Sequence, residues 1–479
     1  MGDLRNIASI SQPRWLKTIL ADTGPPPRLF AWSPANLDPA ASTKCGQVAA
    51  GSGSCREEFI IADDGLNSFK TSLDEDIYIV GAGNIGRLYA SYLARHPNPV
   101  PITLVVHRKE LLSQWVTSDG LELVDRSSGK TIKNKGFKIE WWTEIRPPYG
   151  PVREVGNGAK LRNVFIATKA AAGYSEADRL RRYLGRSSSV VFAQNGVSKL
   201  WPPHGHLYVA ARYPAGGDTP KFSACIVNHG VLSTGPFQSV HAVRAHAFIG
   251  PVLWASCPLS PPCALRQTKQ IVSPCDDFFI KYIITTPYLA TKLVSSGELW
   301  LLQLEKLVMN LAINPLTTLL RCKIGHMFAS RDQQQDPVMR VLDELLRQTT
   351  AVLQGLINHD SSTDILASYV QQLQPFSDGS HNFQEILART REELVKRFSQ
   401  PSLKSRLYTF GLKLAEHRSS MLQDAEAGKK TEIREVNGWI VEMADFLGTG
   451  IDVGIHRNLI KLIERGEILN REELARRLL

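Results

Sequence analysis

Short apolar runs alternate with helix-like stretches over residues 76–253. Residues 87–95 place their apolar side chains at helical spacing soon after the first run. Strands that alternate with helices in this way are typical of a parallel α/β sheet. Residues 205–250 instead have the pattern of mixed or antiparallel strands. The buried strands predicted for the parallel sheet are 77–80, 102–106, 164–167 and 190–193.

From about residue 278 onward the chain has the apolar spacing of helices. The last stretch, 455–479, is highly charged and is predicted to form one helix. The pattern therefore predicts an N-terminal α/β domain over 76–253 and an all-α domain over 278–479, with a binding site in the cleft between them. The other long amphipathic stretches are 284–321, 337–357, 384–398 and 433–447.

Two segments lack this periodicity. Residues 1–75 contain a Gly-Pro-Pro-Pro run and a stretch rich in Ala, Ser, Gly and Pro, which buries too little apolar surface to offset its chain entropy. We predict a poorly structured extension in which only 11–21 have the spacing of a short amphipathic helix. Residues 254–277, with four prolines and three cysteines, are predicted to be a linker.

Composition narrows the classes of partner. The net charge of +10 suits anionic ligands such as phosphates, carboxylates or nucleic acid. No uncharged apolar run reaches the roughly 18 residues of a membrane span, and no RNA-binding pattern is evident. The seven cysteines form no CxxC pair and have no histidine at zinc-ligand spacing, which favours free thiols and no metal site. We expect a small-molecule ligand, no nucleic acid and no membrane span.

The same features bear on the compartment. A mitochondrial presequence is rich in arginine and poor in acidic residues. Here Asp3 and Asp22 interrupt the extension and arginine is sparse. The presequence signal is therefore weak, and we expect a protein of either the cytoplasm or the mitochondrion.

A glycine loop follows the first predicted strand. It has the pattern G-x-G-x-x-G with a β-run before it and a helix after it, which is the context that a Rossmann-type dinucleotide site requires. The glycines permit the tight turn, the approach of the backbone to a pyrophosphate and close packing of the helix. The free N–H groups of the helix N-terminus then face the phosphates. The cofactor-binding residues predicted here are Gly81, Ala82, Gly83, Asn84, Ile85 and Gly86.

The residues at the end of the second predicted strand indicate which dinucleotide is bound. An NAD site usually places Asp or Glu here to bind the ribose 2′-hydroxyl, whereas this chain has His-Arg-Lys at 107–109. A guanidinium can pair bidentately with a 2′-phosphate. We therefore predict that Arg108 binds the 2′-phosphate and that the cofactor is NADPH/NADP+.

A polar stripe runs along an otherwise apolar helix at 299–314. Lys306, Asn310 and Asn314 are spaced i, i+4 and i+8, so they share one face. Burying an ammonium and two amides without partners is costly, which indicates that they face a polar cavity. Desolvation lowers the pKa of such a lysine, and Lys306 could then give a proton to a carbonyl oxygen. The alternative is a helix edge on which the lysine reaches water; Pro315 is expected to end or kink the helix.

Five motifs together resemble the ketopantoate reductase (2-dehydropantoate 2-reductase) family, particularly its longer fungal-type members, over roughly 76–470. The resemblance implies a Rossmann-type NADP-binding domain and a helical domain like the C-terminal one of 6-phosphogluconate dehydrogenase. The motifs are the glycine loop with Arg108, Ala167-Thr168-Lys169, Gln194-Asn195-Gly196, Lys306-x3-Asn310-x3-Asn314-Pro315-Leu316-Thr317, and Ser419–Asp424 followed by Thr431-Glu432-Ile433 and Asn437-Gly438.

The resemblance also implies roles for single residues. Lys306 matches the general acid, and Glu432 matches an acid that contacts the reacting oxygen and orients the site. Ser420 matches a ligand of the substrate carboxylate. The implied substrate-binding residues are Asn310, Asn314, Ser420 and Asn195, and the implied additional cofactor-binding residues are Lys169, Asn195 and Glu432.

The function that the resemblance implies is the NADPH-dependent reduction of 2-dehydropantoate to (R)-pantoate in pantothenate synthesis, by a monomer or homodimer. Hydride reaches the C2 carbonyl while Lys306 protonates the oxygen. Ile324 stands where the family often has a further substrate asparagine, so a reductase of another branched 2-oxo acid is the alternative. A non-catalytic, reductase-like binding or RNA-associated organellar factor is a third reading, which the retained site residues disfavour. Three segments, 1–75, 254–275 and 327–400, exceed the compact bacterial form.

Overall fold

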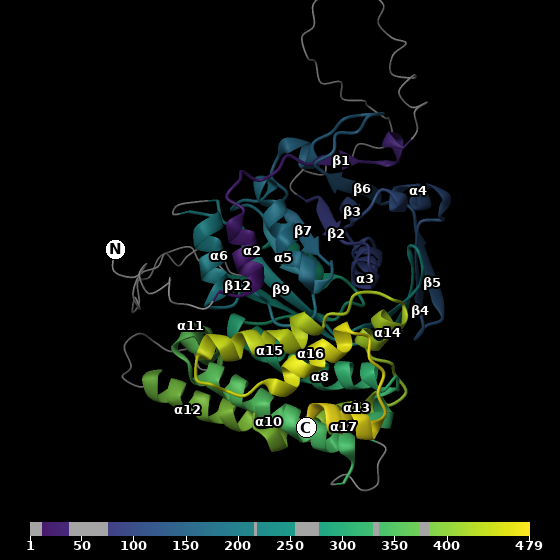
Figure 1. Cartoon of the computed structure of the whole chain (residues 1–479). Helices are drawn as coiled ribbons and strands as arrows, with labels where there is room; N and C mark the ends of the chain where they lie inside the picture. Colours follow the sequence, from purple (N-terminus) through teal and green to yellow (C-terminus); the bar gives the residue numbers. More distant parts are fainter. Residues whose placement is uncertain (1–11, 38–74, 215–217, 254–276, 329–334, 374–382) are drawn as a thin grey trace, which may run out of the picture.

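The computed structural model describes residues 12–37, 75–214, 218–253, 277–328, 335–373 and 383–479. A large sheet and its flanking helices form one domain, and a bundle of helices lies beneath it (Figure 1). Among the helices in these ranges, none has the length and apolar character to span a membrane.

The larger sheet has nine strands in the order β1-β6-β3-β2-β7-β8-β9-β12-β13. Its centre, β6-β3-β2-β7-β8, is parallel and has the strand order of a dinucleotide-binding sheet. The four predicted strands are present, two of them shifted by one residue. The central strands are β2 (Ile77–Val80), β3 (Ile102–Val106), β6 (Lys138–Thr143), β7 (Asn163–Ile166) and β8 (Ser189–Phe192), followed by β9 (Lys221–Val227) and β12 (Ala247–Leu253).

Helices connect these strands. Helix α3 (Asn84–Leu93) joins β2 to β3 and is buried from Gly86 onward, because Leu88, Tyr89 and Tyr92 pack in the core of the sheet domain. The other connecting helices are α4 (Glu110–Thr117), α5 (Ala170–Arg179) and α6 (His204–Arg212). Helix α6 occupies residues for which the sequence pattern had favoured strands.

A second sheet of four strands covers α3, in the order β10-β11-β4-β5. Arg87 of α3 donates to the carbonyl of Gly235 at 2.7 Å and to Ser233 Oγ at 2.9 Å, which ties the dinucleotide helix to this sheet. The strands are β10 (Gly230–Gly235), β11 (Gln238–Val243), β4 (Leu121–Asp125) and β5 (Lys130–Asn134). Of these, β10 and β11 lie within 205–250 and pair antiparallel, in agreement with the pattern there.

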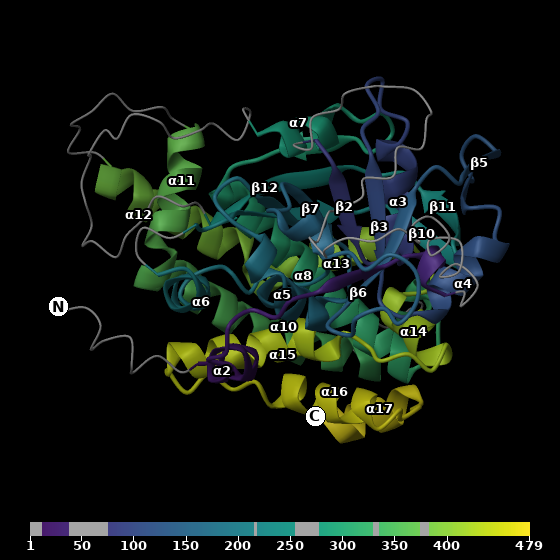
Figure 2. The same ribbon diagram turned by 90° about the horizontal axis from the view of Figure 1, so that it is seen from above.

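The helical domain is built around α8 (Ser296–Leu319), which is buried along most of its length. Its N-terminal half packs against α11, and its C-terminal half packs against α14, which lies at the opposite end of the domain (Figure 1, Figure 2). The remaining helices are α9 (Ile324–Met327), α10 (Pro337–Asn358), α11 (Thr363–Leu373), α12 (Phe383–Arg397), α13 (Gln400–Lys413), α14 (Ser420–Glu426), α15 (Ile433–Leu447), α16 (Gly454–Glu464) and α17 (Arg471–Leu478).

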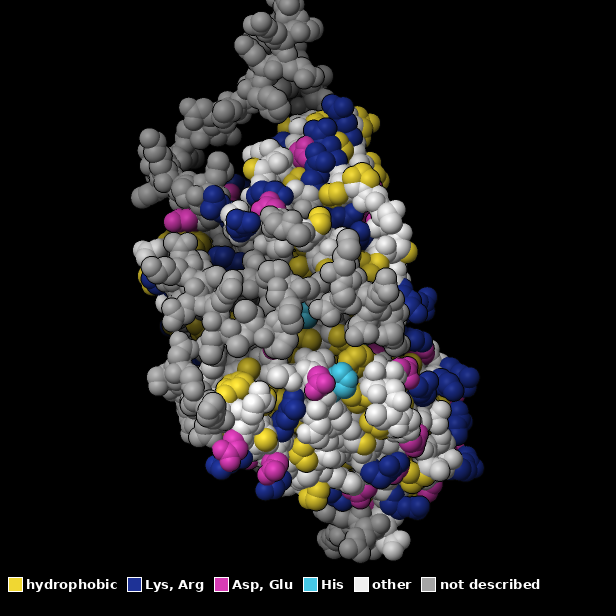
Figure 3. Space-filling model, turned by 90° about the vertical axis from the view of Figure 1, so that its left-hand side faces the viewer, with side chains coloured by type: hydrophobic (Ala, Val, Ile, Leu, Met, Phe, Trp, Pro, Cys, Tyr) yellow, Lys and Arg dark blue, Asp and Glu magenta, His cyan; other side chains and the backbone are white. Residues whose placement is uncertain are grey.

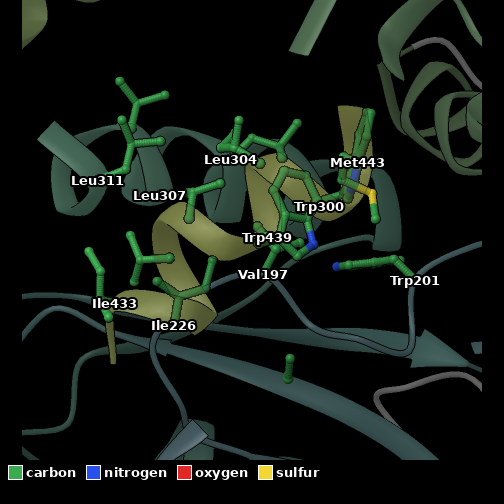
Figure 4. Packing of buried hydrophobic residues seen from close by; sticks show 14 of the residues in the cluster. Val197, Trp201, Ile226, Trp300, Leu304, Leu307, Leu311, Ile433, Trp439 and Met443 are labelled. Carbon is green, nitrogen blue, oxygen red and sulfur yellow. The ribbon is translucent and has the colours of Figure 1, made fainter. Parts of the chain in front are cut away.

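The apolar face of α8 joins the two domains. In Figure 4, Trp300, Leu304 and Leu307 of α8 pack against α15 and above the sheet. Ile226 of β9 and Val197, which follows β8, belong to the same cluster. The polar stripe of α8 is thereby held at the junction of the two domains.

The N-terminal segment is more ordered than predicted. Helix α2 (Arg14–Ala21) lies where the short amphipathic helix was expected and packs near α6, but β1 (Phe30–Trp32) is also formed and pairs antiparallel with β6. Leu29, Ala31 and Trp32 are buried there, which provides the apolar surface that the composition of 1–75 does not suggest. The other residues of that segment, 1–11 and 38–74, and the linker residues 254–276 lie outside the described ranges.

The helical domain also begins later than predicted and ends differently. Helix α7 (Phe278–Thr285) and β13 (Thr291–Leu293) belong to the sheet domain, because β13 pairs with β12 and Phe279 and Ile283 are fully buried in its core. The predicted single helix over 455–479 is two helices, α16 and α17. Gly466, at φ +68°, allows the turn between them.

Pro315 neither ends α8 nor leaves a carbonyl unpaired. The helix continues to Leu319, although Pro315 has no N–H to give to the carbonyl of Leu311. The side chain of Asn437, which is fully buried on α15, donates to that carbonyl at 3.2 Å. Asn437 therefore supports the helix that carries Lys306.

We expect Asn437→Leu to destabilise the fold because it leaves the Leu311 carbonyl buried and unpaired. A lost hydrogen bond of this kind costs about 1–3 kcal/mol. Chemical denaturation should show a lower midpoint with an unchanged slope. An unchanged midpoint would show that Asn437 does not support α8.

Lys and Arg side chains gather along one edge of the helical domain, interspersed with acidic side chains, and at the upper end of the sheet domain (Figure 3). On this face, basic side chains therefore occur on both domains. In the described ranges no group of three or more His, Cys, Asp and Glu side chains could hold a metal ion.

Candidate active site

The glycine loop makes the close contacts that its pattern predicts. Gly81 has φ +107°, and a Cβ there would lie 2.9 Å from the backbone of Ala167 at the end of β7. A Cβ on Gly86 would lie 1.9 Å from the carbonyl oxygen of Gly81. Helix α3 begins directly after Gly83, and no side chain caps its N-terminal N–H groups. A dinucleotide pyrophosphate fits this cradle, since the backbone is bare and the donors are free of a cap.

The other three residues of the loop contact the rest of the sheet domain. Asn84 uses its side chain inside the protein, donating to the carbonyl of Val231 at 3.2 Å and accepting from Arg87 at 2.8 Å. Its contribution to phosphate binding is therefore left to its backbone N–H. Ala82 and Ile85 are partly buried and pack against the core of the sheet domain.

Arg108 follows β3 and is exposed. Within the described chain its guanidinium has no hydrogen-bond or ion-pair partner. Its neighbour Lys109 is placed differently, with Nζ 5.1 Å from the ring centroid of Trp32. Arg108 is thus the cation that remains available for a 2′-phosphate, and no carboxylate at this strand end competes for a ribose hydroxyl.

Lys306 projects from α8 toward the sheet domain. Its Nζ donates to the carbonyl of Val227, at the end of β9, over 2.7 Å. Burial lowers the pKa of Lys306 to about 8, although the nearby Cys225 and Glu432 act in the opposite direction. A proton on this nitrogen is therefore easily given up near neutral pH.

The two asparagines of the stripe lie further along α8. Asn310 is partly exposed and Asn314 is 9% exposed. No described residue makes a hydrogen bond to either side-chain amide. The stripe thus offers one ammonium and two uncommitted amides in a row.

Glu432 connects the two domains at the start of α15. Its Oε1 accepts from the backbone N–H of Ala170 at 3.0 Å, and its Oε2 accepts from Asn195 Nδ2 at 3.1 Å. These donors follow β7 and β8, so the carboxylate is fixed against the carboxyl ends of two neighbouring parallel strands. Since Glu432 also acts electrostatically on Lys306, the predicted general acid lies near Glu432 and the Asn195 amide that Glu432 binds.

Lys169 and Ser420 are placed at the edge of this group. Lys169 Nζ forms an ion pair with Asp424 of α14 at 2.6 Å, which the sequence did not reveal. Ser419 is buried and caps α14 through Leu422, and it also shares a hydrogen bond with Thr317 of α8 at 2.8 Å. Ser420 itself is exposed, and its hydroxyl has no partner among the described residues.

Sequence reasoning missed two kinds of group. The carbonyl of Val227 and the thiol of Cys225 lie on β9, and no motif marks a backbone carbonyl or a lone buried cysteine. Gln303 was also overlooked, although it lies one turn before Lys306.

A hollow of about 20 Å³ lies further toward the N-terminus of α8, where Trp300 contributes to its lining, and neither Lys306 nor the two asparagines line it.

Known proteins share both domains. The family model "Ketopantoate reductase PanE/ApbA" matches residues 77–254, and "Ketopantoate reductase PanE/ApbA C terminal" matches 298–466. A ketoisovalerate reductase of Gibberella fujikuroi is 60% identical over 99% of this chain and 100% of its own length, and one of Beauveria bassiana is 58% identical over 98% and 100%. A probable 2-dehydropantoate 2-reductase of Schizosaccharomyces pombe is 23% identical over 83% and 98%.

Solved structures agree on the fold. D-mandelate dehydrogenase with NADH and anilino(oxo)acetate matches with a TM-score of 0.51 at 14% identity, covering 83% of this chain and 99% of that one. The 2-dehydropantoate 2-reductase of Methylococcus capsulatus matches with a TM-score of 0.50 at 15% identity, covering 82% and 97%. Together with the full-length relatives, the matched models show that the chain is a nicotinamide-dependent oxidoreductase of the ketopantoate reductase (PanE/ApbA) family.

Proposed function

We propose that this protein reduces 2-ketoisovalerate to 2-hydroxyisovalerate with NADPH as the reductant. The observation that carries the chemistry is the cluster in which Lys306, Asn195 and Glu432 meet at the carboxyl ends of the central strands. The substrate is supported by the two relatives named ketoisovalerate reductase, which match this chain over their whole length.

The reaction is NADPH + H⁺ + 2-oxo acid → NADP⁺ + 2-hydroxy acid. The glycine loop and Arg108 would hold NADPH, which would supply a hydride to C2. Lys306 supplies the proton to the carbonyl oxygen, and its hydrogen bond to Val227 fixes the direction of the ammonium. The positive charge also stabilises negative charge that develops on this oxygen.

The other polar residues orient the substrate. Glu432 holds Asn195 through Nδ2, which leaves the amide oxygen of Asn195 free to face a ligand. Asn310 and Asn314 can donate to the substrate carboxylate or to the new hydroxyl. Ser420, exposed beside α8, is the proposed further ligand of the carboxylate.

The preference of the enzyme for one substrate side chain over another is proposed to depend on the residues that follow α8. 2-Dehydropantoate carries a terminal hydroxymethyl group that 2-ketoisovalerate lacks. Ile324 offers no polar group there; it is 5% exposed, and its N–H donates to the carbonyl of His417 at 3.0 Å, three residues before Ser420. An apolar environment at this place favours an isopropyl group.

2-Dehydropantoate is the second candidate substrate. The two free amides of the stripe could accept its additional hydroxyl, and the more distant relative in Schizosaccharomyces pombe is named for that reaction. We propose it as the less favoured substrate. An apolar pocket rejects an added hydroxyl by only about 10²-fold, so measurable activity on both acids is expected.

A comparison of kcat/KM for the two acids tests the proposal. We expect a preference for 2-ketoisovalerate of up to about 10²-fold in the wild type, and a shift of about fivefold toward 2-dehydropantoate in Ile324→Asn, since one hydrogen bond is worth about 1 kcal/mol. Ile324→Val keeps the site apolar and should leave the ratio unchanged. A wild-type enzyme that prefers 2-dehydropantoate would overturn the substrate assignment.

A further inference from the structure

Gln303 joins the catalytic helix to a loop of the sheet domain. It lies on α8 three residues before Lys306 and is 5% exposed. Its side-chain oxygen Oε1 accepts two hydrogen bonds, from the backbone N–H of Ser198 at 3.2 Å and from Trp201 Nε1 at 2.6 Å. Since residues at i and i+3 share a helix face, Gln303 extends the polar stripe by one turn toward the N-terminus.

The loop that Gln303 holds, residues 195–201, begins with Asn195. Near that end, Gly196 has φ +87°, and a Cβ there would lie 2.8 Å from the carbonyl oxygen of Glu435. In the middle, the hydroxyl of Tyr174 bonds Ser198 Oγ at 2.9 Å and accepts from the N–H of Lys199 at 3.0 Å. The loop thus contacts α15 at Gly196 and the sheet domain at Tyr174. Among these side chains, Gln303 is the one that joins the loop to α8.

Gln303 and Lys306 therefore fix two parts of the site from one helix. Lys306 reaches the end of β9, while Gln303 determines where the loop after β8 lies relative to α8. Asn195 is three residues from the Ser198 N–H that Gln303 binds, and Glu432 depends on Asn195 for one of its two partners. A shift of the loop moves the amide and the carboxylate away from the ammonium.

We propose that Gln303 is a positioning residue, which holds Asn195 and Glu432 in register with Lys306 and touches neither substrate nor cofactor. This role rests on the proposed reduction of a 2-oxo acid. A displacement of about 1 Å in a catalytic arrangement can lower the rate by about 10²-fold. Loss of both hydrogen bonds should therefore lower kcat more than it weakens NADPH binding, because the glycine loop, which belongs to β2 and α3, stays in place.

Three variants separate positioning from general stability. Gln303→Leu removes the acceptor, and Gln303→Glu keeps acceptor oxygens for both donors. Gln348→Leu is the matched control: Gln348 is also a buried glutamine on a long helix, 2% exposed on α10, and it holds Ile455 at 3.2 Å and Asp452 at 2.9 Å in another part of the domain. Each variant is measured in the full chain for Tm, for amide hydrogen exchange over 195–201, and for kcat and KM with 2-ketoisovalerate and NADPH.

In Gln303→Leu we expect exchange over 195–201 to become at least tenfold faster and kcat to fall at least tenfold, with a smaller change in the KM for NADPH. Gln303→Glu should keep the slow exchange. Gln348→Leu should lower Tm about as much as Gln303→Leu does, but it should leave kcat unchanged.

Each contrary result has its own meaning. Unchanged exchange in Gln303→Leu would show that the glutamine does not hold the loop, and faster exchange with wild-type kcat would show that the loop position does not matter; either result overturns the inference. A wild-type protein that reduces no 2-oxo acid would overturn the proposed function and this role with it.

Discussion

Lys306→Ala is expected to lower kcat by about 10²–10⁴-fold, the usual contribution of a general acid. The variant removes both the proton donor and the positive charge that Val227 directs into the site. NADPH should bind with unchanged affinity, because the glycine loop and Arg108 do not depend on Lys306. Steady-state kinetics together with fluorescence titration of NADPH separates the two effects, and a near-normal kcat would contradict the mechanism.

The same residue predicts the pH dependence. The protonated form of Lys306 is the active form, and burial lowers its pKa to about 8. The value of kcat/KM should therefore be constant below about pH 8 and fall tenfold with each pH unit above it. An alkaline limb at the usual pKa of an exposed lysine, about 10.4, would show that the ammonium is solvated during the reaction.

Arg108→Ala is expected to raise the Kd for NADPH by about 10- to 100-fold with little change for NADH. A hydrogen bond to a charged group contributes about 1.5–3 kcal/mol, and within the described chain Arg108 has no other partner to lose. Binding titrations with both dinucleotides measure the change in preference directly.

Lys109 supplies the control for this prediction. It is adjacent and equally charged, but its ammonium lies over the ring of Trp32. Lys109→Ala should therefore change the NADPH preference by less than about threefold, since an exposed cation–π contact is worth only about 0.5–1 kcal/mol and does not involve the cofactor. An unchanged NADPH/NADH ratio in Arg108→Ala would remove Arg108 from the cofactor site.

The dinucleotide half of the site could be predicted because its signals are local. The turn at Gly81 and the close packing of Gly86 follow from residues within one βαβ unit, and the structure places both as the pattern requires. The binding of a 2′-phosphate by Arg108 stays a prediction. The polar stripe on α8 could also be recognised in the sequence, since three polar residues on one apolar helix are expected to face a polar environment.

Other features depend on partners far away in the sequence. Strand β1 forms because β6 offers an edge about 110 residues later, and α8 passes through Pro315 because Asn437 replaces the missing donor. Asn84 was assigned to the cofactor from its place in the loop, but its side chain donates to Val231 of the second sheet, in which the sequence pattern did not predict β4 and β5. Gln303 could not be identified from the sequence because its proposed role depends on hydrogen bonds to a loop about 100 residues earlier in the chain.

The substrate assignment depends on a different kind of evidence from the catalytic one. In the proposed mechanism Lys306, Glu432 and Asn195 act at the carbonyl group, and they would serve any 2-oxo acid that fits. The full-length similarity to ketoisovalerate reductases and the apolar Ile324 together favour the substrate without a terminal hydroxyl.

The most direct test is a product analysis with NADPH deuterated at the transferred position and 2-ketoisovalerate. The account predicts one 2-hydroxyisovalerate per NADPH oxidised, with the deuterium on C2, and a large loss of this product in Lys306→Ala. Oxidation of NADPH without 2-hydroxyisovalerate, or a product with no deuterium on C2, would contradict it.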